Sequence, residues 1–146
     1  MKRSVVLALV ACALSACATV TSLASDPAGE LVYPGAVLTN QHETFGDTHE
    51  FNRTYSVPAG TTVQDVFSWY EAQLPALEFH PGKVPTMYAK GEVAQVFNGR
   101  RATVDVGVKL EPADHGIWGT AHAGQAAPAK VLRLQPSQIM VSISGG

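Results

Sequence analysis

The chain has 146 residues, with 10 Lys and Arg against 12 Asp and Glu, and only 15% of its residues are charged. That length suffices for one compact domain and is too short for two. The basic residues are scattered, and the densest pair is Arg100-Arg101. The sequence therefore lacks the basic stripe that nucleic-acid binding requires, and its acidic excess argues against strong adhesion to anionic lipid head groups by charge alone.

The first 16 residues have the layout of a secretory signal. A positive start at Lys2-Arg3 precedes an uncharged and almost wholly apolar run over residues 4–14, and the small pair Ser15-Ala16 follows. This order of charged, apolar and small segments is typical of a signal peptide. A helix that crosses a bilayer needs roughly 20 apolar residues, so the run is too short to span. We therefore expect residues 1–16 to be a signal peptide.

The signal ends in Leu14-Ser15-Ala16-Cys17. This stretch resembles the lipobox of bacterial lipoproteins, which consists of an aliphatic residue, two small residues and a cysteine. In that family the cysteine thiol receives a diacylglyceryl group, and cleavage leaves the cysteine as the first residue. The resemblance implies lipid attachment at Cys17. A second match over Leu9 to Cys12 stays open, although it leaves an apolar core at the low end of the usual 7–15 residues.

The same resemblance implies an exported protein anchored to the bacterial cell envelope. Each buried CH₂ of an acyl chain contributes about 0.8 kcal/mol, so several chains on one residue hold a protein at a membrane. Ala18 follows the cysteine, which favours the outer membrane, facing the periplasm, where the envelope has two membranes. In an envelope with one membrane, the expected place is the outer face of the plasma membrane.

Residues 17–30 are small, polar and turn-forming, and we expect a flexible tether there. A single domain should follow over residues 31–146. Its first elements are a short strand at 36–38 and an alternating strand at 51–57, which together predict a hairpin. The tip of this hairpin should lie near Gly46-Asp47.

The clearest helix begins at Thr62, where Asp65 stands three residues later as in a capping box. Apolar residues then recur with helical spacing until Pro75 stops the helix, and they predict one buried face. These residues are Val63, Val66, Phe67, Tyr70 and Leu74. Trp69 and Tyr70 are candidates for stacking on a ligand, and core packing is the alternative for both.

The strongest strand pattern lies within residues 91–112, where Pro112 ends it. We expect a hairpin there, with Asn98-Gly99 as a two-residue type I′ turn. Shorter strands are expected at 77–80, 86–89 and 131–134, and a last strand over 139–143 should close the sheet. The predicted fold class is α+β, with one amphipathic helix packed on a mainly antiparallel sheet of about five or six strands.

Two short motifs in the expected domain resemble those of small bacterial envelope lipoprotein domains. One is Tyr33-Pro34-Gly35, and the other is the aromatic pair Trp69-Tyr70 ahead of Leu74. That class is largely uncharacterised. The resemblance therefore bears on the fold and the location and implies no activity.

No pattern in the sequence carries catalysis. The chain has no G-x-S-x-G elbow, phosphate-binding loop or dinucleotide-binding glycine motif, and we expect neither an enzyme nor a cofactor. His42 and His49 are the candidate metal ligands, because a hairpin tip could bring them together, although their spacing matches no established ligand pattern. Trp69, Tyr70 and Trp118 are the candidate ligand-binding residues.

These observations lead to two hypotheses about function. The first is a non-catalytic lipoprotein, held at the membrane by its lipid anchor, that binds another envelope component through an exposed sheet edge or the loop around Trp118. The second is a carrier of a small molecule or metal ion, with its pocket between the helix and the sheet.

Overall fold

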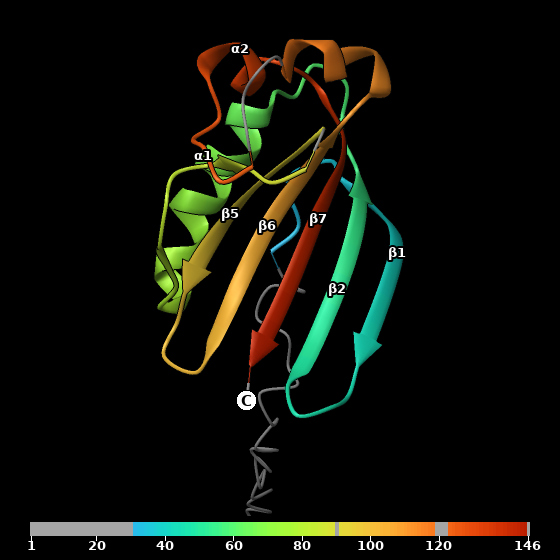
Figure 1. The fold of residues 1–146 in the computed structure, drawn as a ribbon. Coiled ribbons are helices and arrows are strands. Elements are labelled where there is room, and N and C mark those ends of the chain that lie inside the picture. Colours follow the sequence, from blue (N-terminus) through green and yellow to red (C-terminus); the bar gives the residue numbers. More distant parts are fainter. Residues whose placement is uncertain (1–30, 90, 119–122, 146) are drawn as a thin grey trace, which may run out of the picture.

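The computed structural model describes residues 31–89, 91–118 and 123–145. The predicted signal peptide, Cys17 and the tether lie outside these residues. The described chain forms one antiparallel sheet in the order β1-β2-β7-β6-β5-β3, with β4 also paired to β5 (Figure 1). The seven strands are β1 (Val37–Thr44), β2 (His49–Ser56), β3 (His80–Pro81), β4 (Thr86–Met87), β5 (Glu92–Asn98), β6 (Ala102–Leu110) and β7 (Pro136–Gly145). The α+β class is confirmed, with seven strands in place of five or six.

Helix α1 (Val63–Gln73) begins where the capping box predicts. The Thr62 hydroxyl accepts a hydrogen bond from the Asp65 backbone N–H at 3.2 Å, and the Asp65 carboxylate accepts one from the Thr62 N–H at 2.8 Å. These two bonds satisfy N–H groups that a helix start otherwise leaves unpaired. Helix α1 ends at Gln73, and the 3₁₀ helix η1 (Leu74–Leu77) follows it, with Pro75 near its start.

The predicted apolar face of α1 is buried against one face of the sheet. Strand register places Val104 opposite Ile143 and Val108 opposite Ile139, so these side chains share that face. The fully buried core residues of α1 are Val63, Val66, Phe67 and Tyr70, and they belong to the same cluster as the strand valines and isoleucines. Figure 1 views the sheet from the opposite side, with α1 behind it. The sheet therefore has one face covered by α1 and one that we call the helix-free face.

The predicted first hairpin is confirmed. β1 pairs antiparallel with β2 from Val37–Ser56 to Thr44–Glu50, with an irregularity between Leu38 and Asn40. The connecting residues 45–48 include Gly46 and Asp47, as expected.

The predicted turn at Asn98-Gly99 is wrong. Asn98 pairs with Thr103, and the Gly99 N–H donates to the Ala102 carbonyl at 2.9 Å, so Arg100 and Arg101 are the central turn residues. Neither arginine has the positive φ that a type I′ turn requires. A Cβ on Gly99 would lie 2.5 Å from Phe79 Cε1. Glycine is therefore needed for close approach of the Phe79 ring.

Three further strand predictions need correction. Residues 131 and 132 end a short helix, α2 (Ala129–Leu132), in which Val131 is fully buried. Beyond the helix, the Leu134 carbonyl accepts a hydrogen bond from the Val63 N–H at 2.9 Å. This segment thus packs over the start of α1 and adds nothing to the sheet. The expected strand at 77–80 is reduced to β3, because η1 occupies its first residue. Finally, β7 does not close an edge and instead lies between β2 and β6.

Candidate functional site

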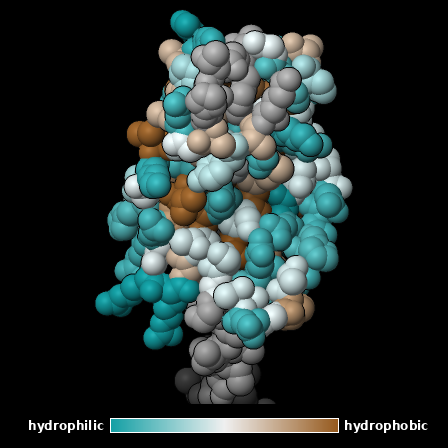
Figure 2. Space-filling view, in the orientation of Figure 1, coloured by the Kyte–Doolittle hydropathy of each residue, from teal (hydrophilic) through white to brown (hydrophobic). Residues whose placement is uncertain are grey.

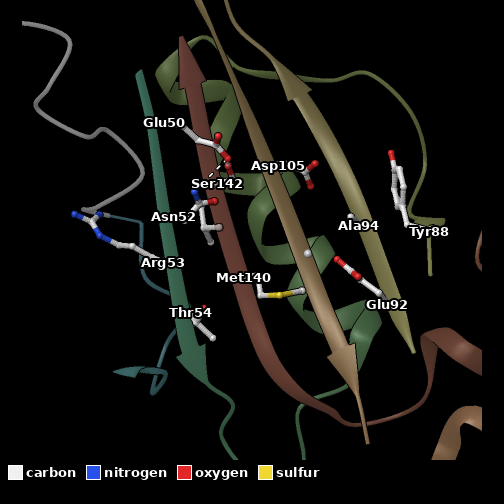
Figure 3. A pocket seen from close by; sticks show the side chains of 12 residues that line it. Glu50, Asn52, Arg53, Thr54, Tyr88, Glu92, Ala94, Asp105, Met140 and Ser142 are labelled. Carbon is white, nitrogen blue, oxygen red and sulfur yellow. Dashed lines mark hydrogen bonds between the residues drawn. The ribbon is translucent and has the colours of Figure 1, made fainter. Parts of the chain in front are cut away.

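The helix-free face carries a shallow hollow of about 390 Å³. Polar side chains from β2, β5, β6 and β7 surround it, and its floor contains Ala94, Gly107 and Met140 (Figure 3). In Figure 2 hydrophilic residues border a smaller apolar area near the middle of this face. Since side chains alternate between the two faces of a strand, these residues are the outward partners of the core positions.

Small residues keep the hollow open. A Cβ on Gly107 would lie 3.2 Å from Met140 Cε and 3.8 Å from the Ala94 Cβ, so a larger side chain at position 107 would occupy the floor. Tyr88, which is 46% exposed, stands at the rim beside β5. The hollow therefore has an apolar floor and an aromatic side chain at one margin.

Carboxylates lie on both sides of this floor. Glu50 Oε1 accepts hydrogen bonds from Asn52 Nδ2 at 3.1 Å and from Ser142 Oγ at 3.0 Å, which hold it in place. Asp105 is half-buried, and this burial raises the pKa of its carboxyl group, with the negative charge of Glu92 adding to the effect. The lining of the hollow thus includes three carboxylates, those of Glu50, Glu92 and Asp105, and one guanidinium, that of Arg53.

The second exposed feature is the edge of the sheet at β1. All eight residues of β1 are exposed, and in the described part of the chain no strand pairs with its outer side. Val37 and Leu38 are apolar residues that are 63% and 45% exposed. An edge strand of this kind presents backbone N–H and C=O groups to a partner.

The two candidate metal ligands lie on opposite faces of the first hairpin. His42 pairs with Asn52, so its side chain shares the helix-free face with Asn52. His49 lies on the other face, where its ring centroid is 4.4 Å from that of Phe51 and its Nε2 is 2.6 Å from Glu43 Oε1. The structure therefore does not bring the two imidazoles together. Across residues 31–89, 91–118 and 123–145, no group of three or more His, Cys, Asp or Glu side chains is placed to hold a metal ion.

The aromatic pair on α1 packs against the segment that enters the domain. Trp69 and Tyr70 lie edge to face at 4.8 Å, and Tyr33 meets Trp69 in the same manner at 5.7 Å. The Tyr70 hydroxyl donates to the Leu31 carbonyl at 3.2 Å, and burial raises its pKa. This geometry fits the core-packing alternative. Trp118 ends the 3₁₀ helix η2 (Pro112–Trp118), and its side chain lies outside the described set.

The space between α1 and the sheet is filled by side chains. Val66, Phe67 and Tyr70 from α1 are fully buried, as are Val106 and Ile139 from the strands. The carrier hypothesis placed its pocket between the helix and the sheet. Within the described residues, the hollow instead lies on the helix-free face, on the opposite side of the sheet.

Sequence reasoning missed the residues that line the hollow. Glu50, Glu92 and Met140 belong to three strands far apart in the chain, and only the register brings them together. Asp105 differs from these three, because it lies between the fully buried Val104 and Val106 on β6, and strand alternation alone directs it away from the core. His115 Nε2 lies 3.3 Å from the Leu110 carbonyl oxygen, and the His115 ring covers Gly91.

Comparison with family models, curated proteins and solved structures finds no match to this chain. In the part of the chain that the structure describes, no helix combines the length and apolar character needed to span a bilayer.

Proposed function

We propose that this protein is a lipoprotein of the bacterial envelope that acts without catalysis, by binding an extended segment of another envelope component along β1. The lipobox-like stretch at Leu14–Cys17 supports the anchor. The observation that carries the binding role is the exposed edge of β1.

Several features of β1 favour strand addition. The strand has eight residues, and its sequence VLTNQHET contains one carboxylate and neither lysine nor proline. Natural sheets commonly guard their edges with lysine, proline, bulges or very short strands. Here the irregularity between Leu38 and Asn40 leaves a regular stretch over Asn40–Thr44 that a partner strand can extend.

The side chains along this stretch define the chemistry of the partner. The pairing with β2 places Gln41 and Glu43 on the face that α1 occupies, and Asn40, His42 and Thr44 on the helix-free face. A paired strand would gain affinity from main-chain hydrogen bonds and selectivity from these side chains. Because they are polar, the matching segment carries polar or basic side chains on both faces.

A photo-crosslinking amino acid at Asn40 tests this proposal in intact membranes. The expected result is one discrete crosslinked protein that is lost when an excess of the unlabelled chain competes. The same amino acid at Gln64, exposed on α1, is the matched control and should give no such product. Equal products from both positions, or none from Asn40, would contradict binding along β1.

A second candidate function, the carriage of a small cationic molecule, is favoured by the hollow on the helix-free face. Its carboxylates Glu50, Glu92 and Asp105 and its apolar floor match an amine with a hydrocarbon part. A ligand that binds the native state raises its stability, so spermidine should raise the melting temperature in a saturable manner. Glu92→Gln should abolish that rise, and Glu78→Gln, at an exposed position away from the hollow, should preserve it. A melting temperature that spermidine leaves unchanged would exclude this candidate for polyamines.

A further inference from the structure

One end of the sheet combines exposed apolar side chains with paired arginines. It consists of Phe45 and Thr48 in the β1–β2 turn, Arg100 and Arg101 in the β5–β6 turn, Leu77 at the end of η1, and Gly145 in β7. We call this surface the basal end. Both turns and the C-terminal end of the chain lie at the same end of the molecule in Figure 1, and α2 lies at the other.

The basal end is continuous across the sheet. One hollow joins Thr48, Arg101 and Gly145, and a second, of about 570 Å³, joins Leu77 to the same arginine turn. Phe45 is 75% exposed and Leu77 is 39% exposed. Two apolar side chains therefore lie on either side of two cationic ones.

The chain enters the domain close to this end. The Leu31 carbonyl accepts a hydrogen bond from Tyr70 in the last turn of α1. Just after this helix, the Leu74 carbonyl accepts a hydrogen bond from the Phe79 N–H. The Phe79 ring in turn packs against Gly99 in the β5–β6 turn. The first described residue is thus attached to the half of α1 that points toward the basal end.

We propose that the basal end rests on the phospholipid bilayer to which the chain is anchored, with Phe45 and Leu77 in the interface and Arg100 and Arg101 facing lipid phosphates. This orientation rests on the proposed anchor at Cys17. Leu31, the first described residue, follows Cys17 by 14 residues. Strands of eight to ten residues span about 30 Å, and Leu31 is hydrogen-bonded to the half of α1 nearest the basal end. The chain that leads from the anchor therefore meets the domain nearer to the basal end than to the opposite end.

Charge by itself does not attach this end to lipid. Glu78 lines the hollow that contains the two arginines, and Asp47 is exposed in the β1–β2 turn, so both carboxylates offset the positive charge. His80 pairs beside the β5–β6 turn, and the His49 ring, hydrogen-bonded to Glu43, stacks on Phe45 at 4.5 Å. The acyl chains supply attachment, and the basal end sets orientation through apolar contact and through hydrogen bonds from each guanidinium to phosphate.

An environment-sensitive fluorescent amino acid tests this orientation. It is placed at Phe45 or, as the matched control at the opposite end, at exposed Ala129 in α2. Residues 17–146 are coupled through Cys17 to a maleimide lipid in vesicles of phosphatidylethanolamine and phosphatidylglycerol with brominated acyl chains. We expect loss of emission at position 45 and none at position 129. Equal quenching at both positions, or quenching at 129 alone, would overturn the proposal.

A second pair of variants separates apolar contact from mere proximity. With the fluorescent amino acid at Thr48, the double change Phe45→Ala and Leu77→Ala should reduce quenching, and Val84→Ala should not. Val84 is 61% exposed and follows Lys83, whose carbonyl accepts a hydrogen bond from Gln95 in the middle of β5. Unchanged quenching in the double variant would overturn the role of these side chains. Because the lipid is coupled chemically, the result is independent of whether cells acylate Cys17.

Discussion

At position 99 the backbone conformation would suit other residues, and the surrounding packing still requires glycine. Its φ is not positive, yet a Cβ would lie 2.5 Å from the Phe79 ring, which is itself only 7% exposed. The Asn-Gly pair predicts a positive-φ turn, and the structure instead uses the missing side chain for packing. The contact joins residues 20 positions apart, so local sequence could not reveal it.

Gly99→Ala should therefore destabilise the domain by about 1–3 kcal/mol, the usual range when a well-packed site receives an extra carbon. The free energy of unfolding in urea measures this effect. Gly46→Ala is the control, because the nearest atom to its Cβ would be the Thr48 carbonyl oxygen at 4.0 Å. A Gly99→Ala chain as stable as the Gly46→Ala chain would show that the Phe79 ring moves aside without cost.

Asp105 links the hollow to the pH dependence of stability. Its pKa is raised above 3.8 by burial and by Glu92, so between 3.8 and the folded-state pKa the folded protein binds more protons than the unfolded chain. Stability attributable to this group falls as the pH rises through that window. Asp105→Asn should therefore raise the melting temperature at pH 7. The gain in the free energy of unfolding should be less than about 1 kcal/mol, because solvent screens a half-exposed group.

The gain from Asp105→Asn should disappear at pH 3, where the wild-type carboxyl group is also neutral. Asp47→Asn in the exposed β1–β2 turn is the control and should leave the melting temperature nearly unchanged at both pH values. A stabilisation by Asp105→Asn that persists at pH 3 would mean that lost charge is not its cause.

At the scale of elements, α1 could be predicted because its determinants are local. Thr62 and Asp65 form the cap three residues apart, and the buried residues follow the period of the helix. The two hairpins were also predictable from alternation over adjacent segments. The central position of β7 was not, because it depends on pairing with β2 and β6, which precede it by about 90 and 40 residues. The alternating apolar residues of β7 indicate a strand, but they do not determine which other strands pair with it.

Thr62→Ala should cost about 1 kcal/mol, the typical loss when an N-cap side chain is removed. It deletes the acceptor for the Asp65 N–H and a hydroxyl that donates to the Asp65 carboxylate at 2.7 Å. Thermal unfolding followed by circular dichroism measures the change. Gln64→Ala on the exposed face of α1 should change stability by less than about 0.5 kcal/mol, and an equal loss in both variants would contradict a specific role for the cap.

At the scale of the whole molecule, the sheet divides the protein into a covered face, a helix-free face and a free edge. The sequence predicts the covered face well, because its apolar residues recur with period 2 on strands and with helical period on α1. The hollow with Glu50 and Glu92 was not predictable, since neither residue stands out until the strands are paired. For the same reason the register separates His42 from His49, which lie close in sequence.

The proposed location of this molecule depends on lipid attachment at Cys17, and the mass of the N-terminal peptide tests that attachment most directly. The measurement is mass spectrometry of the protein isolated from membranes of its native cells. The account predicts a chain that begins at residue 17, with the mass of a diacylglyceryl group on that cysteine. An unmodified cysteine with residues 1–16 still attached would contradict the anchor, and with it the placement of the basal end on a membrane.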